Sequence, residues 1–289
     1  MSILIERAND LELLSAFLAD INNQKFNHIG FCGTDQADIL RTLKEDFIDE
    51  KGDASFFIAK NNTGEIIAAC GLDIENREAE AWGPFNKTES MEISAELWRR
   101  LKENYPAVQQ FSFLINEKNT KQQLFMKQIN AEEKGHHLSL ITHRSRFEML
   151  EEIKSSSMKA EDFPAFQDLH DVTFPGTYYD AETIWDRLNK DNKLKVLKDD
   201  NGGLIGYAYF EIDKEISEAS LEYFAVSKNY QNKGFGSLLL KEALTAMFSY
   251  SEINEIYLTV DAGNHQANHI YEKAGFAKGD TLIHYKSDG

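Results

Sequence analysis

A short segment with two glycines, residues 231–236, separates an apolar run that ends at Val226 from a leucine-rich stretch at residues 238–240. This order is typical of a strand that turns into a helix. Glycine lets the backbone come close to a ligand, and the free N–H groups at the beginning of a helix attract an anion. The segment therefore predicts a strand–turn–helix unit that holds a phosphate group.

The rest of the chain alternates between expected helices and strands, and it does so in two similar series. The first series has helices at 10–17, 39–47, 91–101 and 120–131, and strands at 56–59, 66–70, 79–82, 111–115 and 138–142. The second has helices at 162–170, 181–188, after 236 and at 266–274, and strands at 194–197, 204–210, 221–226, 256–260 and 282–285. The hairpin turns at Gly64 and Gly202 are 138 residues apart, and the later strands are 145 residues apart. We therefore predict two tandem copies of one α/β fold with a mixed sheet, at residues 1–150 and 151–289.

Composition excludes several classes of protein. The formal net charge of −17 argues against binding to the nucleic-acid backbone and suits a cationic partner better. No apolar stretch approaches the roughly 18 residues of a membrane span, and the N-terminus lacks the apolar core of a signal peptide, so we expect a cytoplasmic protein. Cys32 and Cys70 are the only cysteines, too few for a disulfide framework, and no metal-ligand spacing occurs.

The glycine segment fits neither of two common phosphate loops. A dinucleotide fingerprint requires Gly or Ala where this chain has Leu239, and a P-loop requires a Gly-Lys-Ser/Thr ending. A second pattern follows the next strand: Asn264, Asn268, Tyr271 and Gly275 advance by four, three and four residues, so they share one face of a helix. That face is expected to line the bound cofactor.

The two motifs together, Gln-x-x-Gly-x-Gly at 231–236 and the helix from Asn264 to Gly275-Phe276, resemble those of the GNAT superfamily of N-acetyltransferases. The resemblance covers residues 155–289 and implies acetyl-CoA as the co-substrate and no metal. In that family backbone amides grip the pyrophosphate, an Asn contacts the pantetheine arm, and a Tyr faces the reacting sulfur. The cofactor-binding residues that it implies are Phe224, Ala225, Val226, Gln231, Asn232, Lys233, Gly234, Phe235, Gly236, Ser237, Asn264 and Asn268.

Two residues are candidates for catalysis. Tyr271, with an ordinary pKa near 10, stays protonated at neutral pH and is able to donate its proton to a leaving thiolate. The competing interpretation is a ring that only packs in the helix. Glu222 is the candidate base, on a strand whose alternation places it on the face shared with Phe224, and family members often use a carboxylate at about this place. A solvated surface acid is the alternative for Glu222.

The expected helices at 162–170 and 181–188 lie where the family shapes its acceptor site. Aromatic residues there, among them Tyr178 and Tyr179, stand close in sequence to Asp180 and other acids, which suits a cationic amine. A packed hydrophobic hinge explains the aromatic residues equally well. The sequence selects neither the acceptor, a small-molecule or peptide amine, nor an oligomeric state.

The first copy lacks the glycine loop, since no glycine occurs between Gly83 and Gly135. Met126 stands where the repeat places Tyr271. We therefore expect residues 1–150 to form a degenerate copy without a CoA site. The leading hypothesis is an acetyl-CoA-dependent N-acetyltransferase with one active site. Its alternatives are a transferase of longer acyl groups and a CoA-binding sensor or interaction module without turnover.

Overall fold

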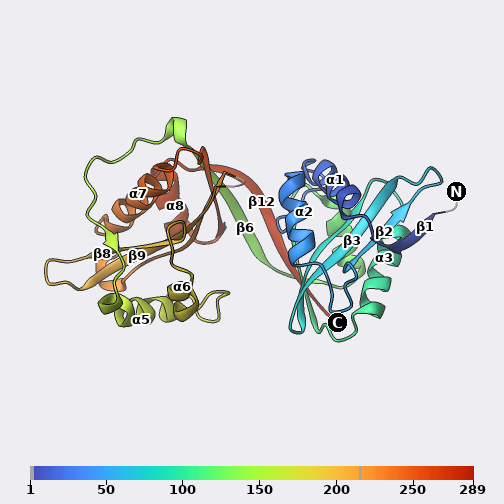
Figure 1. Cartoon of the computed structure of the whole chain (residues 1–289), viewed down its shortest axis with the longest axis horizontal. Coiled ribbons are helices and arrows are strands. Elements are labelled where there is room, and N and C mark those ends of the chain that lie inside the picture. The colour runs from blue at the N-terminus through green and yellow to red at the C-terminus, as the bar shows by residue number, and fades with distance from the viewer. Residues whose placement is uncertain (1–2, 215–216) are drawn as a thin grey trace. The chain divides into compact units, whose positions relative to one another are not determined.

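The computed structural model describes residues 3–214 and 217–289 (Figure 1). They form two compact units, Met1–His137 together with Asp280–Gly289, and Leu138–Gly279. This division differs from the predicted cut at residue 150 in two ways: the second unit begins earlier, at Leu138, and the last strand of the chain belongs to the first unit. No helix of the described residues is long and apolar enough to cross a membrane.

The first unit has helices on both faces of its sheet. Strands β1 to β4 pair antiparallel in sequence order, β4 pairs parallel with β5, and β5 pairs antiparallel with β12. Helices α1 and α2 pack on one face, around Leu14 and Phe56, while α3 and α4 pack on the other, around Trp98 and Phe111. The elements are β1 (Leu4–Arg7), α1 (Leu11–Asn22), α2 (Gln36–Glu45), β2 (Phe56–Lys60), β3 (Ile66–Glu75), β4 (Glu78–Asn86), α3 (Met91–Asn104), β5 (Gln110–Asn116), α4 (Thr120–Gln128) and β12 (Ala277–Asp288).

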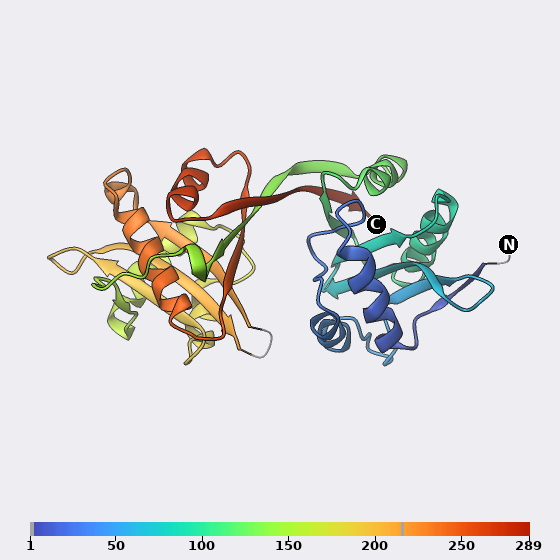
Figure 2. The same cartoon turned by 90° about the horizontal axis from the view of Figure 1, so that it is seen from above.

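The second unit repeats this plan, and its helix α7 is the orange helix in Figure 2. Helices α5 and α6 cover one face of the sheet, while α7 and α8 cover the other. Strands β7 to β10 pair antiparallel, and β10 pairs parallel with β11. The elements are β6 (Glu132–His143), β7 (Ser156–Ser157), α5 (Phe163–Thr173), α6 (Ala181–Arg187), β8 (Lys193–Lys198), β9 (Leu204–Asp213), β10 (Glu218–Val226), α7 (Phe235–Phe248), β11 (Glu255–Asp261) and α8 (His265–Lys273).

The two units are copies of one fold, as the sequence predicts. Asn119 and Asn264 cap the beginnings of α4 and α8 in the same way, each side chain accepting a hydrogen bond from the N–H group three residues on. One feature departs from simple repetition. Strand β6 follows the first copy's α4 but its C-terminal half lies beside β11 in the second unit, whereas β12 follows α8 and pairs with β5 in the first unit. The copies therefore exchange their last strands.

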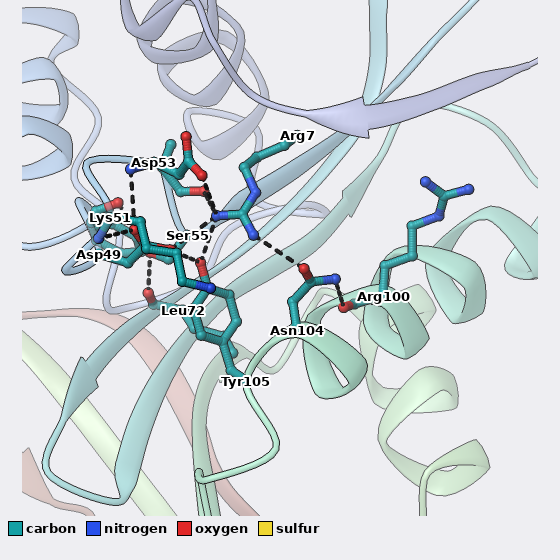
Figure 3. A network of polar contacts seen from close by, with 11 residues as sticks. Arg7, Asp49, Lys51, Asp53, Ser55, Leu72, Arg100, Asn104 and Tyr105 are labelled. Atoms are coloured by element: carbon teal, nitrogen blue, oxygen red, sulfur yellow. Dashed lines mark hydrogen bonds and ion pairs between the residues drawn. The ribbon is translucent and has the colours of Figure 1, made fainter.

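In the first unit, Arg7 fastens the edge strand β1 to two neighbouring segments (Figure 3). Its guanidinium donates to Asp49 at 3.0 Å and to the Tyr105 hydroxyl at 3.1 Å from one nitrogen, and to Asn104 at 3.1 Å from the other. The Tyr105 hydroxyl also donates to Asp49 at 3.1 Å. Charge-assisted hydrogen bonds of this kind stabilise structure, so we assign this cluster to the packing of the first unit rather than to a reaction.

The segment between β6 and β7, which the sequence suggests is a linker, is fixed to α7. The Glu242 side chain is only 1% exposed and accepts hydrogen bonds from the backbone N–H groups of Lys154 at 2.9 Å and Ser155 at 2.7 Å. Thr245 accepts a further one from the N–H group of Leu150 at 3.2 Å. Residues 144–157 therefore belong to the second unit rather than to a free connection.

Replacement of Glu242 by glutamine is expected to lower the free energy of unfolding by about 1–3 kcal/mol, because a buried N–H group loses its charged acceptor. Urea unfolding followed by circular dichroism measures the change. Glu152→Gln is the matched control, since Glu152 is exposed. Equal stability of the two variants and the native chain contradicts the assigned role of Glu242.

Candidate functional site

The glycine segment forms a tight loop in front of α7. Asn232 and Gly234 take left-handed backbone conformations, with φ of 59° and 86°. Gln231 and Lys233 hold the loop in place, because their side chains donate to the carbonyl groups of Val226 at 3.0 Å and Asn229 at 2.9 Å. The turn needs Gly234 because a side chain at such a φ is strained.

The beginning of α7 has free backbone donors. Gly234 has no side chain to cap the helix, and the first backbone hydrogen bond runs from the N–H group of Leu238 to the carbonyl of Gly234 at 3.1 Å. Within the described residues, the N–H groups of Phe235, Gly236 and Ser237 have no backbone partner. Three free donors at the positive end of a 14-residue helix suit a phosphate group.

Gly236 lies next to side chains of both β10 and α8. A Cβ atom at this position would lie 3.4 Å from Ile270 Cδ1, 3.7 Å from Val226 Cγ2 and 3.8 Å from Phe224 Cζ. These are ordinary van der Waals distances, so alanine fits but a longer side chain has to extend toward the helix start. The absence of a side chain keeps that space open.

Strands β10 and β11 separate next to this loop. They form a parallel pair at Ser220 and Tyr257, before the point where they separate. On its other side, β10 stays paired with β9 through Ala225 and Ser227. Because hydrogen bonding alternates along an antiparallel pair, the backbone groups of Phe224 and Val226 point toward the separated strand and those of Ala225 toward β9. An extended ligand chain is able to pair with the backbone of Phe224 and with the N–H group of Val226, whose carbonyl already accepts from Gln231.

Glu222 lies in a β-bulge, which corrects its predicted orientation. Leu221 and Tyr223 pair with adjacent residues of β9, Phe210 and Tyr209, so Glu222 is the extra residue. Leu221 packs toward α7 and Tyr223 toward α5 and α6, which shows that the bulge reverses the alternation of the strand. The expectation that Glu222 shares a face with Phe224 is therefore wrong.

The neighbours of Glu222 confirm this placement and affect its acidity. Desolvation raises the pKa of the carboxyl group; a hydrogen bond from Ser220 and the charge of Arg187 lower it, and the charge of Glu211 raises it. Ser220 and Glu211 are cross-strand partners on the α5 side of the sheet. Glu222 is also exposed, so water screens these interactions, and the net direction is upward.

Tyr271 lies on α8 with its ring against β10. Its ring centroid is 6.4 Å from that of Phe224 and 5.6 Å from that of Phe276. Burial raises the pKa of the hydroxyl to about 12, and no described residue forms a hydrogen bond with that hydroxyl. The hydroxyl is therefore protonated at neutral pH and free to donate a proton or a hydrogen bond to a ligand.

The two asparagines of α8 have different surroundings. Asn264 caps the helix, with its side-chain oxygen 3.0 Å from the N–H group of Ala267. Asn268 is 8% exposed and donates to the carbonyl of Ala262 at 3.2 Å, but its buried oxygen has no partner among the described residues. An acceptor left without a donor in a buried position fits a ligand that carries an N–H group, as the pantetheine arm does.

Sequence reasoning missed a group of residues on the α5 and α6 side. Arg187 forms two parallel hydrogen bonds with Glu211 and stacks on the Tyr179 ring, whereas Asp180, which the sequence suggests as a binding group, caps α6. The Tyr223 hydroxyl bonds Thr177 and accepts from the N–H group of Tyr179. Arg187 and Glu211 lie on separate elements, so no local spacing reveals the pair.

In the first unit, the place of the glycine loop is taken by side chains. Asn86 accepts a hydrogen bond from the N–H group of Thr88 at 2.8 Å, and the Lys121 ammonium donates to the carbonyl of Thr88 at 2.7 Å. A cavity of about 480 Å³ lies beside them, but Lys87 on its wall pairs with Asp20 at 2.6 Å. Lys121 on the same wall pairs with Glu89 at 3.1 Å, so both lysines that line this cavity have a carboxylate partner, and a degenerate first copy stays a prediction.

Part of the chain is similar in sequence to known acetyltransferases. Residues 157–276 match the acetyltransferase (GNAT) family. The chain is 37% identical over 65 residues to an N-alpha-acetyltransferase of Sulfurisphaera tokodaii, and 27% identical over 109 residues to a spermidine N(1)-acetyltransferase of Vibrio cholerae. These alignments cover 22% and 37% of this chain and only 39% and 63% of the two relatives.

Solved structures extend the likeness in fold to the whole chain. A GCN5-related N-acetyltransferase from Sphaerobacter thermophilus superposes with a TM-score of 0.77 at 14% identity, over 99% of this chain and 95% of that one. A tandem GNAT protein from the clavulanic acid biosynthesis pathway gives 0.67 at 13% identity, over 99% and 98%. The fold of the whole chain is therefore that of tandem GNAT proteins, and residues 157–276 are similar in sequence to the acetyltransferase (GNAT) family.

Proposed function

We propose that the protein is an acetyl-CoA-dependent N-acetyltransferase with one active site, in the second unit. The observation that carries the proposal is the row of free N–H groups of Phe235, Gly236 and Ser237, next to the point where β10 and β11 separate. These donors would hold the pyrophosphate. Phe224 and Val226 would pair with the pantetheine arm, whose N–H group would also reach the free oxygen of Asn268.

The chemistry assigns a separate role to each polar group. Glu222 would take the proton from the ammonium form of the acceptor, directly or through water, because only the neutral amine attacks a carbonyl carbon. A backbone N–H group of Phe224 or Val226 would stabilise the negative charge that develops on the carbonyl oxygen. Tyr271 would donate its proton to the departing sulfur, for which the raised pKa keeps it in the correct form.

We propose a primary amine that carries a positive charge as the acceptor. Among the relatives are a spermidine N(1)-acetyltransferase and a probable spermine N(1)-acetyltransferase, whose names specify such acceptors. The carboxylates Glu211 and Glu222 lie on the face of the sheet that α5 and α6 cover, which we call the acceptor side. Aromatic rings such as Tyr179 lie beside them, and this arrangement attracts cations.

Release of coenzyme A tests this function. The protein is mixed with acetyl-CoA and a panel of amines, and free thiol is followed with a thiol reagent. Amine-dependent release supports acetyl transfer, whereas measurable acetyl-CoA binding without release for any amine leaves the sensor or interaction module as the better explanation. Faster release from a longer acyl-CoA identifies a transferase of that group.

The raised pKa of Glu222 predicts a dependence on pH. The carboxyl group acts as a base only when deprotonated, so kcat/KM for the acceptor should rise with pH through a pKa above the ordinary value of 4.5. Glu222→Gln should remove this limb and lower kcat/KM by about 100-fold. Glu182→Gln, on the exposed side of α6, is the control. Identical profiles for Glu222→Gln and the native chain exclude Glu222 as the base.

A further inference from the structure

The two carboxylates of the acceptor side differ in their partners. Glu211 accepts hydrogen bonds from Nε and Nη2 of Arg187 at 3.0 and 2.9 Å, and the Tyr209 hydroxyl donates to the same carboxylate. Glu222 has the hydrogen bond from Ser220 and no ion pair with any residue in the described ranges. One negative charge is therefore neutralised by the protein, and the other is left for a ligand.

Contacts that need no ligand hold Arg187 in position. Its guanidinium carbon lies 4.3 Å from the centroid of the Tyr179 ring, and the two-pronged pair with Glu211 fixes its plane. Both backbone polar groups of Tyr179 are held as well. Its N–H group donates to the Tyr223 hydroxyl at 3.0 Å, and its carbonyl oxygen lies 2.9 Å from Nε2 of the buried His170. The Arg187 side chain is therefore paired with Glu211 before an acceptor binds.

The three charged groups that interact here, Arg187, Glu211 and Glu222, add to one unit of negative charge. Arg187 contributes a positive charge, and Glu211 and Glu222 contribute one negative charge each. The ammonium form of a single amine balances that total. A second ammonium group on the same acceptor would find Glu211 occupied and Arg187 nearby as a like charge, which is unfavourable.

We propose that Arg187 is a specificity-determining residue that masks Glu211, so that a second positive charge on the acceptor gains no binding energy there and diamines and polyamines bind no more tightly than acceptors with one positive charge. The inference rests on the proposed acetyl-transfer function. It distinguishes this chain from relatives whose names specify spermidine and spermine. Glu222 alone then pairs with the ammonium group of the acceptor and accepts its proton.

Amine binding, measured by calorimetry in the presence of coenzyme A at physiological salt, tests the proposal without requiring turnover. The probes are n-butylamine, 1,4-diaminobutane and spermidine. For the native chain we expect Kd values within about threefold of one another. Arg187→Met should unmask Glu211, so that spermidine binds at least about fivefold more tightly than n-butylamine, and Arg187→Met combined with Glu211→Gln should restore the native pattern.

Two further variants make the result decisive. Arg187→Lys keeps the charge and should retain the native pattern, while Arg146→Met makes the same change of net charge at an exposed position and should also leave it unchanged. The proposal is overturned if the binding affinity rises with each added charge on the amine to the same extent in the native chain and in Arg187→Met. It is also overturned if none of the variants binds any of the amines. If the amines bind in the expected pattern but no acetyl group is transferred, only the proposed function is rejected.

Discussion

Replacement of Tyr271 by phenylalanine is expected to lower kcat by about 100- to 1,000-fold. The affinity for acetyl-CoA should change by less than about threefold, because the variant removes an interaction made only as the thiolate leaves. The ring contacts with Phe224 and Phe276 persist in the variant, and the hydroxyl has no partner among the described residues whose loss would disturb the fold. Steady-state kinetics together with direct acetyl-CoA binding separates the two effects.

Tyr257→Phe is the matched control for this change. Tyr257 is 47% exposed on β11, and its hydroxyl donates to Glu255. Its removal should leave kcat unchanged. If Tyr271→Phe turns over within about twofold of the native chain, the proton of the leaving thiol comes from water or another group, and Tyr271 is only a packing residue.

Replacement of Gly236 by glutamate is expected to weaken acetyl-CoA binding by at least about 100-fold, since a carboxylate would occupy the place of the pyrophosphate and repel it. A Cβ atom fits at this position, 3.4 Å from the nearest side-chain atom, so the fold should tolerate the change. A negative charge near the beginning of α7 is also favourable for the helix itself.

Gly236→Ala separates size from charge. The added methyl group makes only ordinary contacts with Ile270 and Val226, so binding should weaken far less than in the glutamate variant. Equilibrium dialysis or calorimetry with acetyl-CoA gives both constants, and thermal unfolding checks that each variant is folded. Normal acetyl-CoA binding by Gly236→Glu means that the phosphate site lies elsewhere.

The parts of the site that one local stretch encodes were predictable from the sequence. Gly234 and Gly236 predict a turn between a strand and a helix, and the structure has this turn, with Gly234 in the left-handed conformation. The spacing from Asn264 to Tyr271 predicts a helix that brings Asn268 and Tyr271 to the same region, although Asn264 itself caps that helix. Each of these features depends on residues that are near one another in the chain.

Features that depend on pairing between distant segments were not predictable. The bulge at Glu222 arises from the register between β9 and β10, and one inserted residue is enough to reverse the side on which a carboxylate lies. The pair of Arg187 with Glu211 joins a helix to a strand. The partner of the last strand cannot be read from its alternation, because pairing with β5 or with β11 requires the same pattern of apolar residues.

The exchanged strands explain why a copy without a binding loop has remained in the chain. A gene shortened to residues 151–289 encodes a second unit that lacks β6, and a gene shortened to residues 1–150 encodes a first unit without the strand that pairs with β5. Either fragment has an open sheet edge, which invites aggregation. Deletion of the first copy therefore removes a strand from the second copy as well, so the two copies are inherited together.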